Sequence, residues 1–343
     1  MSILVTGGSG YIGSHTVLSL LEKGFEVVVL DNLVNSSKES LARVEKLTGK
    51  TLTFYEGDIA DEILLNKIFN DHAIDCVIHF AALKAVGEST KQPYRYYKNN
   101  VLGTLNLLET MYKNEINNFI FSSSATVYGE ENKPPYVETQ PLGNPTSPYG
   151  TTKLTVEKIM QDAAKAYPKV RMISLRYFNP IGAHISGDIG EDPNGPPNNL
   201  VPYITQVAVG KRASLQVFGN NYNTKDGTCE RDYLHVEDLA EGHVAALEWL
   251  EATSLFTGFE TFNLGTGNPV SVTEIINKFE SVTGVKIAHE YVDRRDGDLP
   301  AFWANCEKAN HVLDWFAKRT LEDMLSSAWE WQRKNPDGYC YKN

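Results

Sequence analysis

The chain has 343 residues, of which 42% are hydrophobic and 22% are charged, and its formal net charge is -11 at pH 7. These proportions are typical of a globular protein with a large core. The negative charge argues against nucleic-acid binding, because proteins that hold the phosphate backbone usually carry a basic patch. It is compatible with a nucleotide ligand, which needs only a few local donors.

The start of the chain and its cysteines bear on where the protein works. The chain opens with the strand-like run Ile3-Leu4-Val5-Thr6 and no basic leader, and no apolar run is long enough to cross a membrane. The cysteines Cys76, Cys229, Cys306 and Cys340 are scattered and form no C-x-x-C pair. We therefore expect a cytoplasmic protein with reduced thiols and no metal site.

The first half of the chain alternates apolar strand-like runs with segments of helix length. The expected strands are Ile3–Thr6, Val27–Leu30, Leu52–Tyr55, Cys76–His79, Asn118–Ser122 and Met172–Leu175. The expected helices are Ile12–Lys23, Lys38–Thr48, Glu62–Asp71, Val101–Lys113 and Thr152–Ala166. Nearly continuous apolar runs are typical of strands buried on both faces. The alternation predicts an α/β fold with a Rossmann-type doubly wound parallel sheet.

The pattern changes after Asn179. The segment Gly182–Leu200 is rich in Gly, Pro and Asn and predicts a long ordered loop, which in a compact enzyme is usually functional. Beyond it we expect helices over Tyr203–Gly210 and Val272–Val282, and a strand at Phe262–Leu264 that returns to the main sheet.

These patterns predict two domains. Residues 1–180 form the dinucleotide-binding domain, to which a later segment of about 235–265 returns. Residues 181–343 mainly form a smaller, discontinuous, mixed α/β domain for the substrate.

A glycine-rich turn follows the first predicted strand. Gly7, Gly10 and Gly13 have the G-x-x-G-x-x-G spacing that permits a tight turn and close approach of a pyrophosphate to the backbone at a helix N-terminus. Asp31 ends the second strand, where a carboxylate reaches the adenosine ribose and repels a 2′-phosphate, which favours NAD over NADP. Asp58, after the third strand, is suited either to the adenine edge or to a cap of its own loop.

Two residues of the helix after Pro148 have the spacing of a catalytic pair. Tyr149 and Lys153 are at i and i+4 and therefore lie on one face of a helix. A nearby ammonium favours the phenolate, so Tyr149 can act as a base and Lys153 can also hold the nicotinamide ribose. Ser124, which follows a predicted strand, would hydrogen-bond the reacting oxygen. The pair is a strong signal only because it accompanies the glycine turn.

Several longer motifs share a pattern with a known family. Besides the glycine turn they are Asp31-Asn32, Phe80–Lys84, Ser122–Gly129, Tyr149 with Lys153, Arg176–Asn179, Asn198–Leu200, Arg231–Tyr233 and Arg294–Asp298. Together they resemble the UDP-sugar 4-epimerases of the extended short-chain dehydrogenase/reductase family. The resemblance spans nearly the whole chain and implies tightly bound NAD as cofactor and a homodimer built on the helices near Val101–Lys113 and Thr152–Ala166.

The resemblance also implies which side chains contact each ligand. The implied catalytic residues are Tyr149, Lys153 and Ser124. The implied cofactor residues are Gly7, Gly10, Tyr11, Ile12, Gly13, Asp31, Asn32, Asp58, Ile59, Phe80, Ala81, Lys84, Asn99, Ser122, Tyr149, Lys153 and Tyr177. The implied UDP-sugar residues are Ser124, Tyr149, Asn179, Asn199, Leu200, Phe218, Arg231, Tyr233, Arg295, Asp298 and Phe302. Guanidinium groups suit a pyrophosphate, in agreement with the two arginines.

The implied reaction is the reversible interconversion of UDP-glucose and UDP-galactose. The sugar is oxidised at C4 to a 4-keto sugar, turns while tethered by UDP, and is reduced on its other face. The bulk of Phe302, at a position that borders the sugar pocket in this family, implies a preference for sugars without an N-acetyl group.

Three other functions compete with this one. A 4,6-dehydratase needs a carboxylate beside the active hydroxyl, and Ser124-Ala125-Thr126 has none. A non-catalytic dinucleotide sensor would typically lack the Tyr149 and Lys153 pair. A related UDP-sugar epimerase or decarboxylase, acting for example on UDP-glucuronate, is left open by the sequence.

Overall fold

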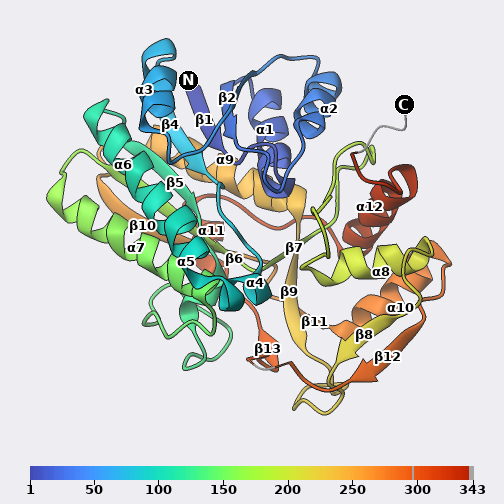
Figure 1. The fold of residues 1–343 in the computed structure, drawn as a ribbon. Helices are drawn as coiled ribbons and strands as arrows, with labels where there is room; N and C mark the ends of the chain where they lie inside the picture. The colour runs from blue at the N-terminus through green and yellow to red at the C-terminus, as the bar shows by residue number, and fades with distance from the viewer. Residues whose placement is uncertain (296, 340–343) are drawn as a thin grey trace.

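The computed structural model describes residues 1–295 and 297–339 (Figure 1). Asp296, in one of the motifs above, and Cys340, one of the four expected thiols, lie outside the described residues. Among the described residues, no helix has the length and apolar character needed to cross a membrane.

The core of the fold is a seven-stranded parallel sheet with the order β10-β6-β5-β4-β1-β2-β3. Its strands are β1 (Ser2–Thr6), β2 (Glu26–Asp31), β3 (Thr53–Glu56), β4 (Ile74–His79), β5 (Asn118–Ser122), β6 (Arg171–Tyr177) and β10 (Gly258–Leu264). The predicted doubly wound α/β fold is thereby confirmed. The chain reverses its winding direction between β1 and β4, and crevices at the carboxyl ends of such strands are where ligands bind in open α/β sheets.

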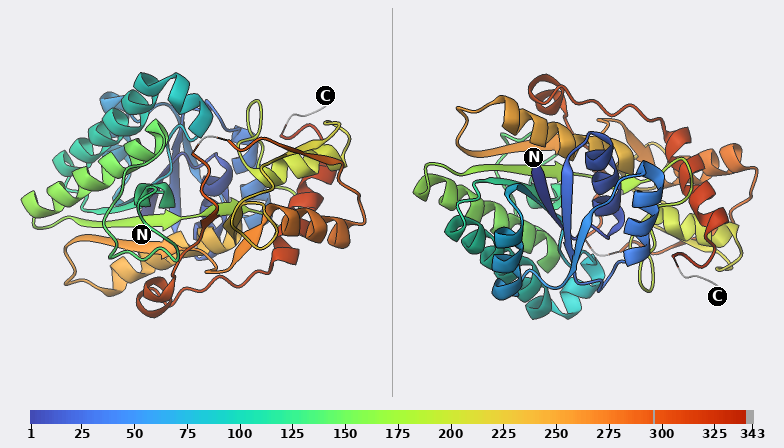
Figure 2. Two further views of the ribbon diagram at one scale, coloured as in Figure 1. Left: turned by 90° about the horizontal axis from the view of Figure 1, so that it is seen from below. Right: turned by 90° about the horizontal axis from the view of Figure 1, so that it is seen from above.

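Helices cover both faces of this sheet (Figure 2). One face carries α1 (Tyr11–Glu22), α2 (Lys38–Thr48) and α9 (Val236–Ala252), and the other carries α3 (Glu62–Asp71), α6 (Gly103–Lys113) and α7 (Pro148–Ala166). Within β1, Ile3 and Val5 pack against the layer that contains α1, α2 and α9, and Leu4 packs against the layer that contains α3, α6 and α7. Successive side chains of a strand point to opposite faces, so two covered faces require the continuous apolar run seen in the sequence.

The structure differs from the sequence prediction in the helices of the second layer. The helix predicted from Val101 begins as a π-helix, η1 (Tyr97–Leu102), after the short helices α4 (Val86–Lys91) and α5 (Pro93–Tyr96). The helix predicted from Thr152 begins four residues earlier because Ser147 caps it, accepting a hydrogen bond from the Gly150 amide at 3.2 Å, and Pro148 occupies its first turn.

The second lobe packs around its own apolar cluster. Its helices are α8 (Leu200–Ala208), α10 (Val272–Thr283) and α12 (Leu321–Lys334), whereas α11 (Glu307–Val312) packs in the main core beside β10. Its strands are β7 (Asn179–Ile181), β8 (Leu215–Phe218), β9 (Glu230–His235), β11 (Pro269–Ser271), β12 (His289–Val292) and β13 (Ala301–Phe302). β9 pairs with β7, β11 and β13, and β8 pairs with β12. This lobe faces the carboxyl ends of the central strands (Figure 1).

Candidate active site

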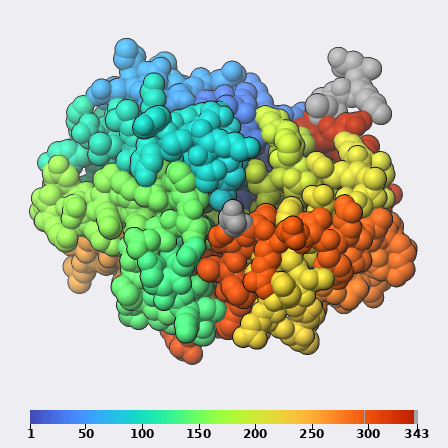
Figure 3. All heavy atoms as spheres, turned by 60° about the horizontal axis from the view of Figure 1, so that its bottom comes forward, coloured from blue at the N-terminus to red at the C-terminus, as the bar shows by residue number. Residues whose placement is uncertain are grey.

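A cavity of about 340 Å³ lies at the carboxyl ends of the central strands. In the space-filling view, the surface is hollowed where the teal N-terminal half meets the yellow and orange C-terminal segments (Figure 3). The glycine turn, the ends of β2 to β6 and the loop of residues 182–199 line this cavity. The long loop expected from Gly182 therefore forms one wall of the cavity.

The cavity brings together most of the predicted site residues. All the predicted cofactor residues line it, from Gly7, Gly10, Tyr11, Ile12 and Gly13 through Asp31, Asn32, Asp58, Ile59, Phe80, Ala81, Lys84, Asn99 and Ser122 to Tyr149, Lys153 and Tyr177. Of the predicted sugar residues, Ser124, Tyr149, Asn179, Asn199 and Phe302 line it. Leu200, Phe218, Arg231, Tyr233, Arg295 and Asp298 are not among the lining residues.

The glycine turn has the close approaches that explain its composition. Gly7 has φ of +72°, and a Cβ atom there would lie 2.6 Å from the backbone nitrogen of Ala81. A Cβ atom at Gly13 would collide with the Gly7 carbonyl oxygen and the Gly8 Cα. Only glycine fits at both positions, and the bare backbone at the start of α1 leaves room for a pyrophosphate. The turn thus fits NAD.

Asp31 lies at the end of β2 and is 7% exposed. Its Oδ2 accepts a hydrogen bond from the Ser9 amide at 2.9 Å, and its Oδ1 accepts from the Leu33 amide and from the Ser36 hydroxyl. The carboxylate therefore connects the glycine turn to the loop after β2 at the edge of the cavity. A negative charge held there disfavours a 2′-phosphate, as expected for an NAD site.

Asp58 caps its own loop, which is one of the two roles that the sequence left open, and it also lies at the edge of the cavity. Its Oδ1 accepts from the Ala60 amide at 2.9 Å, which caps its own loop, while its Oδ2 accepts from the Asn32 amide group at 2.8 Å and the residue lines the cavity.

The catalytic pair lies where α7 crosses the end of β5. Lys153 Nζ donates to the Ser122 carbonyl oxygen at 2.7 Å and lies 5.9 Å from the ring centroid of Tyr149. Tyr149 and Ser124 line the cavity together, and hydrogen bonding from Ser124 lowers the pKa of the Tyr149 hydroxyl. The predicted base Tyr149, the predicted cation Lys153 and the predicted hydroxyl group of Ser124 therefore lie near one another in the cavity.

Burial dominates the electrostatics of this pair. It raises the pKa of Tyr149 well above its ordinary value, an effect that the hydrogen bond with Ser124 opposes. It lowers the pKa of Lys153 to about 7, and the nearby Glu157 carboxylate opposes this effect. A positive charge in the site is therefore needed to stabilise the phenolate form of Tyr149. The Glu157 carboxylate behind Lys153 likewise stabilises the ammonium form of Lys153.

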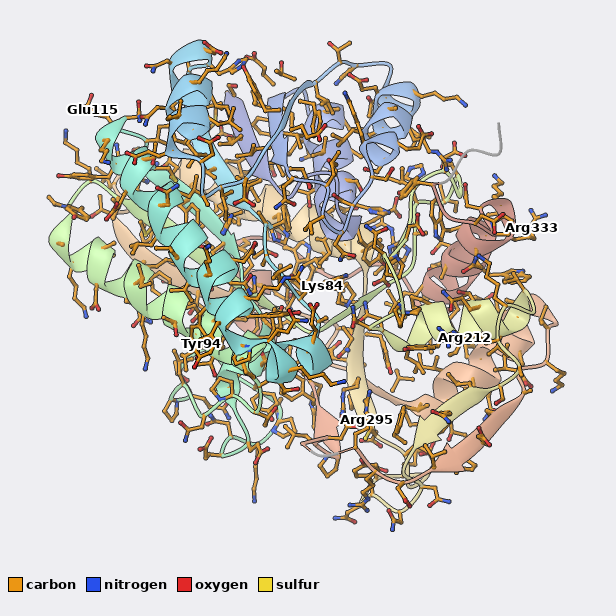
Figure 4. The ribbon with its side chains drawn as sticks, viewed as in Figure 1. Lys84, Tyr94, Glu115, Arg212, Arg295 and Arg333 are labelled. Atoms are coloured by element: carbon orange, nitrogen blue, oxygen red, sulfur yellow. The ribbon has the colours of Figure 1, made fainter. Side chains whose placement is uncertain are left out.

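Four of the six predicted sugar residues outside the cavity lining, Phe218, Arg231, Arg295 and Asp298, form a second cluster in the other lobe. Arg231 Nη2 lies 3.6 Å from Asp298 Oδ1, and Arg295 Nε donates to Asp298 Oδ2 at 2.9 Å. The Arg295 guanidinium stands 4.7 Å from the ring centroid of Phe218. Tyr233 on β9 pairs with Asn179 on β7, so β9 connects this cluster to the cavity. In Figure 4, Lys84 lies beside the central sheet and Arg295 lies beyond β9.

An aromatic group closes the side of the cavity where Phe302, a predicted sugar residue, lies. The Phe302 ring centroid lies 4.7 Å from that of Tyr136 and 5.1 Å from that of Phe178. Phe302 and Phe178 both line the cavity. Phe302 is thus held by neighbouring rings and cannot easily turn aside for a larger sugar.

The sequence interpretation missed Glu191 and Tyr339, which also line the cavity. Glu191 Oε1 accepts from the Asn199 amide group at 2.7 Å and lies 3.4 Å from Lys84 Nζ. The Tyr339 hydroxyl bonds the backbone of Gly190. The loop was recognised by its composition, but no motif distinguished these two side chains from other polar residues.

The sheet, glycine turn and buried Tyr149–Lys153 pair define an NAD-dependent dehydrogenase-type site. The chain matches the NAD dependent epimerase/dehydratase family over residues 3–265 and belongs to that family. Among its relatives are UDP-glucose 4-epimerases from several organisms. That of Erwinia amylovora is 58% identical over 98% of this chain and 99% of the relative, and that of Bacillus subtilis is 54% identical over 99% of each.

Solved structures agree with the sequence relatives. A crystal structure of UDP-glucose 4-epimerase from Bifidobacterium longum in complex with NAD+ and UDP has a TM-score of 0.95 and 48% identity, covering 98% of this chain and 100% of that one. A UDP-glucose 4-epimerase from Stenotrophomonas maltophila, with bound NAD and formylated UDP-arabinopyranose, also has a TM-score of 0.95, with 45% identity over 98% of this chain and 99% of that one.

Proposed function

We propose that this chain interconverts UDP-glucose and UDP-galactose by inverting C4 of the sugar. The observation that carries the proposal is that Tyr149, Ser124 and Lys153 line one cavity, which also holds the complete set of predicted cofactor residues. The identity of 54% or more to named UDP-glucose 4-epimerases along the whole chain supports the choice of substrate.

The cofactor-binding half of the site is proposed to use the glycine turn for the pyrophosphate of NAD, Asp31 for the adenosine ribose, and Lys153 for the nicotinamide ribose. Bound NAD supplies the hydride acceptor and, in its oxidised form, a positive charge that favours the Tyr149 phenolate. Because no net oxidation occurs, the cofactor could stay in place through each cycle.

Side chains of the protein are proposed to transfer the proton and to bind the UDP-sugar. Tyr149 takes the proton of the sugar 4-hydroxyl while Ser124 hydrogen-bonds the same oxygen, and Tyr149 returns the proton when the 4-keto sugar is reduced on its other face. Arg231 and Arg295 are proposed to hold the UDP moiety. Their cluster lies in the second lobe, away from the catalytic pair, so the sugar can turn while its nucleotide stays bound.

The alternative of a decarboxylase is not favoured. A UDP-glucuronate substrate needs a basic or hydroxyl partner for its carboxylate, and the identity to named UDP-glucose 4-epimerases along the chain favours a sugar without that carboxylate. Among the described residues that line the cavity the only Lys or Arg side chains are Lys84 and Lys153. Lys84 lies against Glu191, and Lys153 is bound to the Ser122 carbonyl.

Incubating the purified protein with UDP-galactose, without added cofactor, tests the proposal. After the reaction is stopped by heat, UDP-glucose is assayed with a coupled dehydrogenase. We expect UDP-glucose to form, because NAD should copurify. Activity only after NAD is added would contradict tight cofactor retention, and no activity in either case would reject 4-epimerisation.

The bulk of Phe302 predicts substrate preference. We expect UDP-N-acetylglucosamine to turn over at least about tenfold more slowly than UDP-glucose, since one misfitting group costs about 1–3 kcal/mol in a packed pocket. Phe302→Ser should reduce the ratio of the UDP-glucose rate to the UDP-N-acetylglucosamine rate. Phe316→Ser, at a half-exposed position outside the cavity lining, should leave that ratio unchanged. Comparable rates of the unmodified protein on both substrates would refute the preference.

We further propose a homodimer formed through the face of η1, α6 and α7. Leu102 and Tyr112 on this face are 55% and 54% exposed. Sedimentation velocity at micromolar concentration should show twice the monomer mass, and Leu102→Asp should reduce it to the monomer. Leu255→Asp, at a 96% exposed position after α9, is the matched control and should leave the dimer intact. A monomer for the unmodified chain would contradict this assembly.

Two expectations from the sequence complete the proposal. The first domain comprises residues 1–180 with a later segment of about 235–265, and the second comprises the rest of 181–343. The packing of α9 and β10 on the central sheet supports this division.

A cytoplasmic location is supported by Cys76, Cys229 and Cys306, which are free thiols, as is usual in a reducing compartment.

A further inference from the structure

Glu157 is a fully buried carboxylate on the catalytic helix. It lies one turn beyond Lys153 and two turns beyond Tyr149, at the i, i+4 and i+8 positions, so all three side chains share one face of α7. It does not line the cavity. Its function therefore has to be sought in what it contacts behind the catalytic pair.

Glu157 receives hydrogen bonds from β6 and from the residue that directly follows β5. Its Oε1 accepts from the Ser123 hydroxyl at 2.6 Å and from the Ser174 hydroxyl at 2.7 Å. The guanidinium of Arg176 donates to both of its oxygens, with Nη2 2.6 Å from Oε2 and Nε 3.1 Å from Oε1. Every oxygen of this carboxylate is thus held in a fixed direction.

The contact between Glu157 and Ser123 fixes the position of α7 relative to the end of β5, because the preceding turn of α7 holds the preceding residue of the chain. Lys153 Nζ donates to the Ser122 carbonyl oxygen at 2.7 Å, and Glu157 holds Ser123, the next residue. Ser124, the predicted hydroxyl for the reacting oxygen, follows immediately. A slip of α7 along β5 would break both contacts and separate Tyr149 from Ser124.

The partner of Glu157 continues the network to the far side of Ser124. Arg176 Nη1 donates to the Tyr128 hydroxyl at 3.2 Å, and that hydroxyl donates to Asn263 Oδ1 at 2.6 Å. Tyr128 ends the 3-10 helix η2 (Ala125–Tyr128), which begins directly after Ser124. The network therefore fixes the chain both before and after Ser124.

From this geometry we propose, resting on the epimerase function proposed above, that Glu157 is the positioning residue that keeps the catalytic helix in register with Ser122–Ser124. A buried ion pair contributes little net stability compared with a well-packed apolar pair of the same size, so stability alone gives no reason for one here. The Glu157 carboxylate also opposes the effect of burial on the pKa of Lys153, which favours the ammonium.

Two serine variants form a matched test. Ser123→Ala and Ser174→Ala each delete one buried hydroxyl from the same Glu157 oxygen, but only Ser123 adjoins the catalytic residues. We expect similar losses of stability in urea unfolding and unchanged NAD content in both. We expect Ser123→Ala to lower kcat for UDP-galactose by about tenfold or more with little change in KM, because small misplacements of reacting groups are costly. Ser174→Ala should stay within about twofold of the unmodified kcat by the same geometric argument.

A double variant separates positioning from stability. Glu157→Met with Arg176→Met replaces the ion pair with apolar side chains of similar length and should remain folded, with a Tm lowered because the buried Ser123 and Ser174 hydroxyls lose their acceptor. We expect its kcat to fall about 100-fold, since the register of α7 is no longer fixed. A folded double variant with normal kcat, or equal kcat in the two serine variants, would overturn the proposal. If the double variant does not fold, the serine pair decides. Failure of the unmodified protein to epimerise would instead reject the function itself.

Discussion

Replacing Tyr149 with Phe is expected to lower kcat for UDP-galactose by about 10³-fold, within the range that a positioned base contributes. The substitution removes only the hydroxyl that contacts Ser124, while the ring keeps its place beside Leu83 and Tyr96. The glycine turn and Lys153 are unchanged, so we expect the purified variant to retain NAD. The measurements are steady-state kcat and the NAD released on denaturation.

The exposed Tyr291, on β12 in the second lobe, provides the control for this substitution. Tyr291→Phe removes the same hydroxyl from a tyrosine outside the cavity lining and should keep normal kcat. Near-normal activity of Tyr149→Phe would remove Tyr149 from the role of base. A loss of NAD together with activity would point instead to a cofactor-binding role.

The sheet could be predicted from the sequence because its strands are covered on both faces. β5 matches its predicted bounds, Asn118–Ser122, and α2 matches Lys38–Thr48. In α2, Ser37 accepts a hydrogen bond from the Glu39 amide at the start, and Gly49 takes a left-handed conformation with φ of 66° at the end. Such local signals fix helix ends without help from the rest of the fold.

The second lobe was less predictable because its contacts are distant in sequence. β13 has two residues, Ala301 and Phe302, and is a strand only because it pairs with Glu230 and Arg231 on β9. No periodicity can be read from so short a segment. The long helix α9 was also not predicted, although its apolar side packs on α1 in the main core.

The candidate site also contains residues that the sequence could predict and residues that it could not. The cofactor residues lie in motifs next to strand ends, and the parallel sheet brings those ends together. Glu157 and Glu191 carry no motif. Their importance depends on partners such as Ser123, Ser174 and Asn199, which only the folded chain places beside them.

Acidification is expected to destabilise the protein steeply because four histidines are buried. Burial lowers the pKa of His15, His79 and His235 to about 3 and that of His243 to about 4. In the unfolded chain these groups bind protons near pH 6.5, whereas in the folded chain they stay neutral until about pH 4 or below. The unfolded state therefore gains more protons as the pH falls from 6.5 towards 3, and stability is lost across that window.

The size of this effect makes it measurable by urea unfolding at pH 7.5 and 5.5. One pH unit below 6.5, each buried histidine lowers the free energy of unfolding by about 1.4 kcal/mol, so four together remove about 5.6 kcal/mol, a large part of a typical folding free energy. His243→Gln should reduce the difference between the two pH values by about 1 kcal/mol. The exposed His311→Gln is the matched control and should leave it unchanged. Equal stability of the unmodified protein at both pH values would mean that these histidines are already protonated in the folded state.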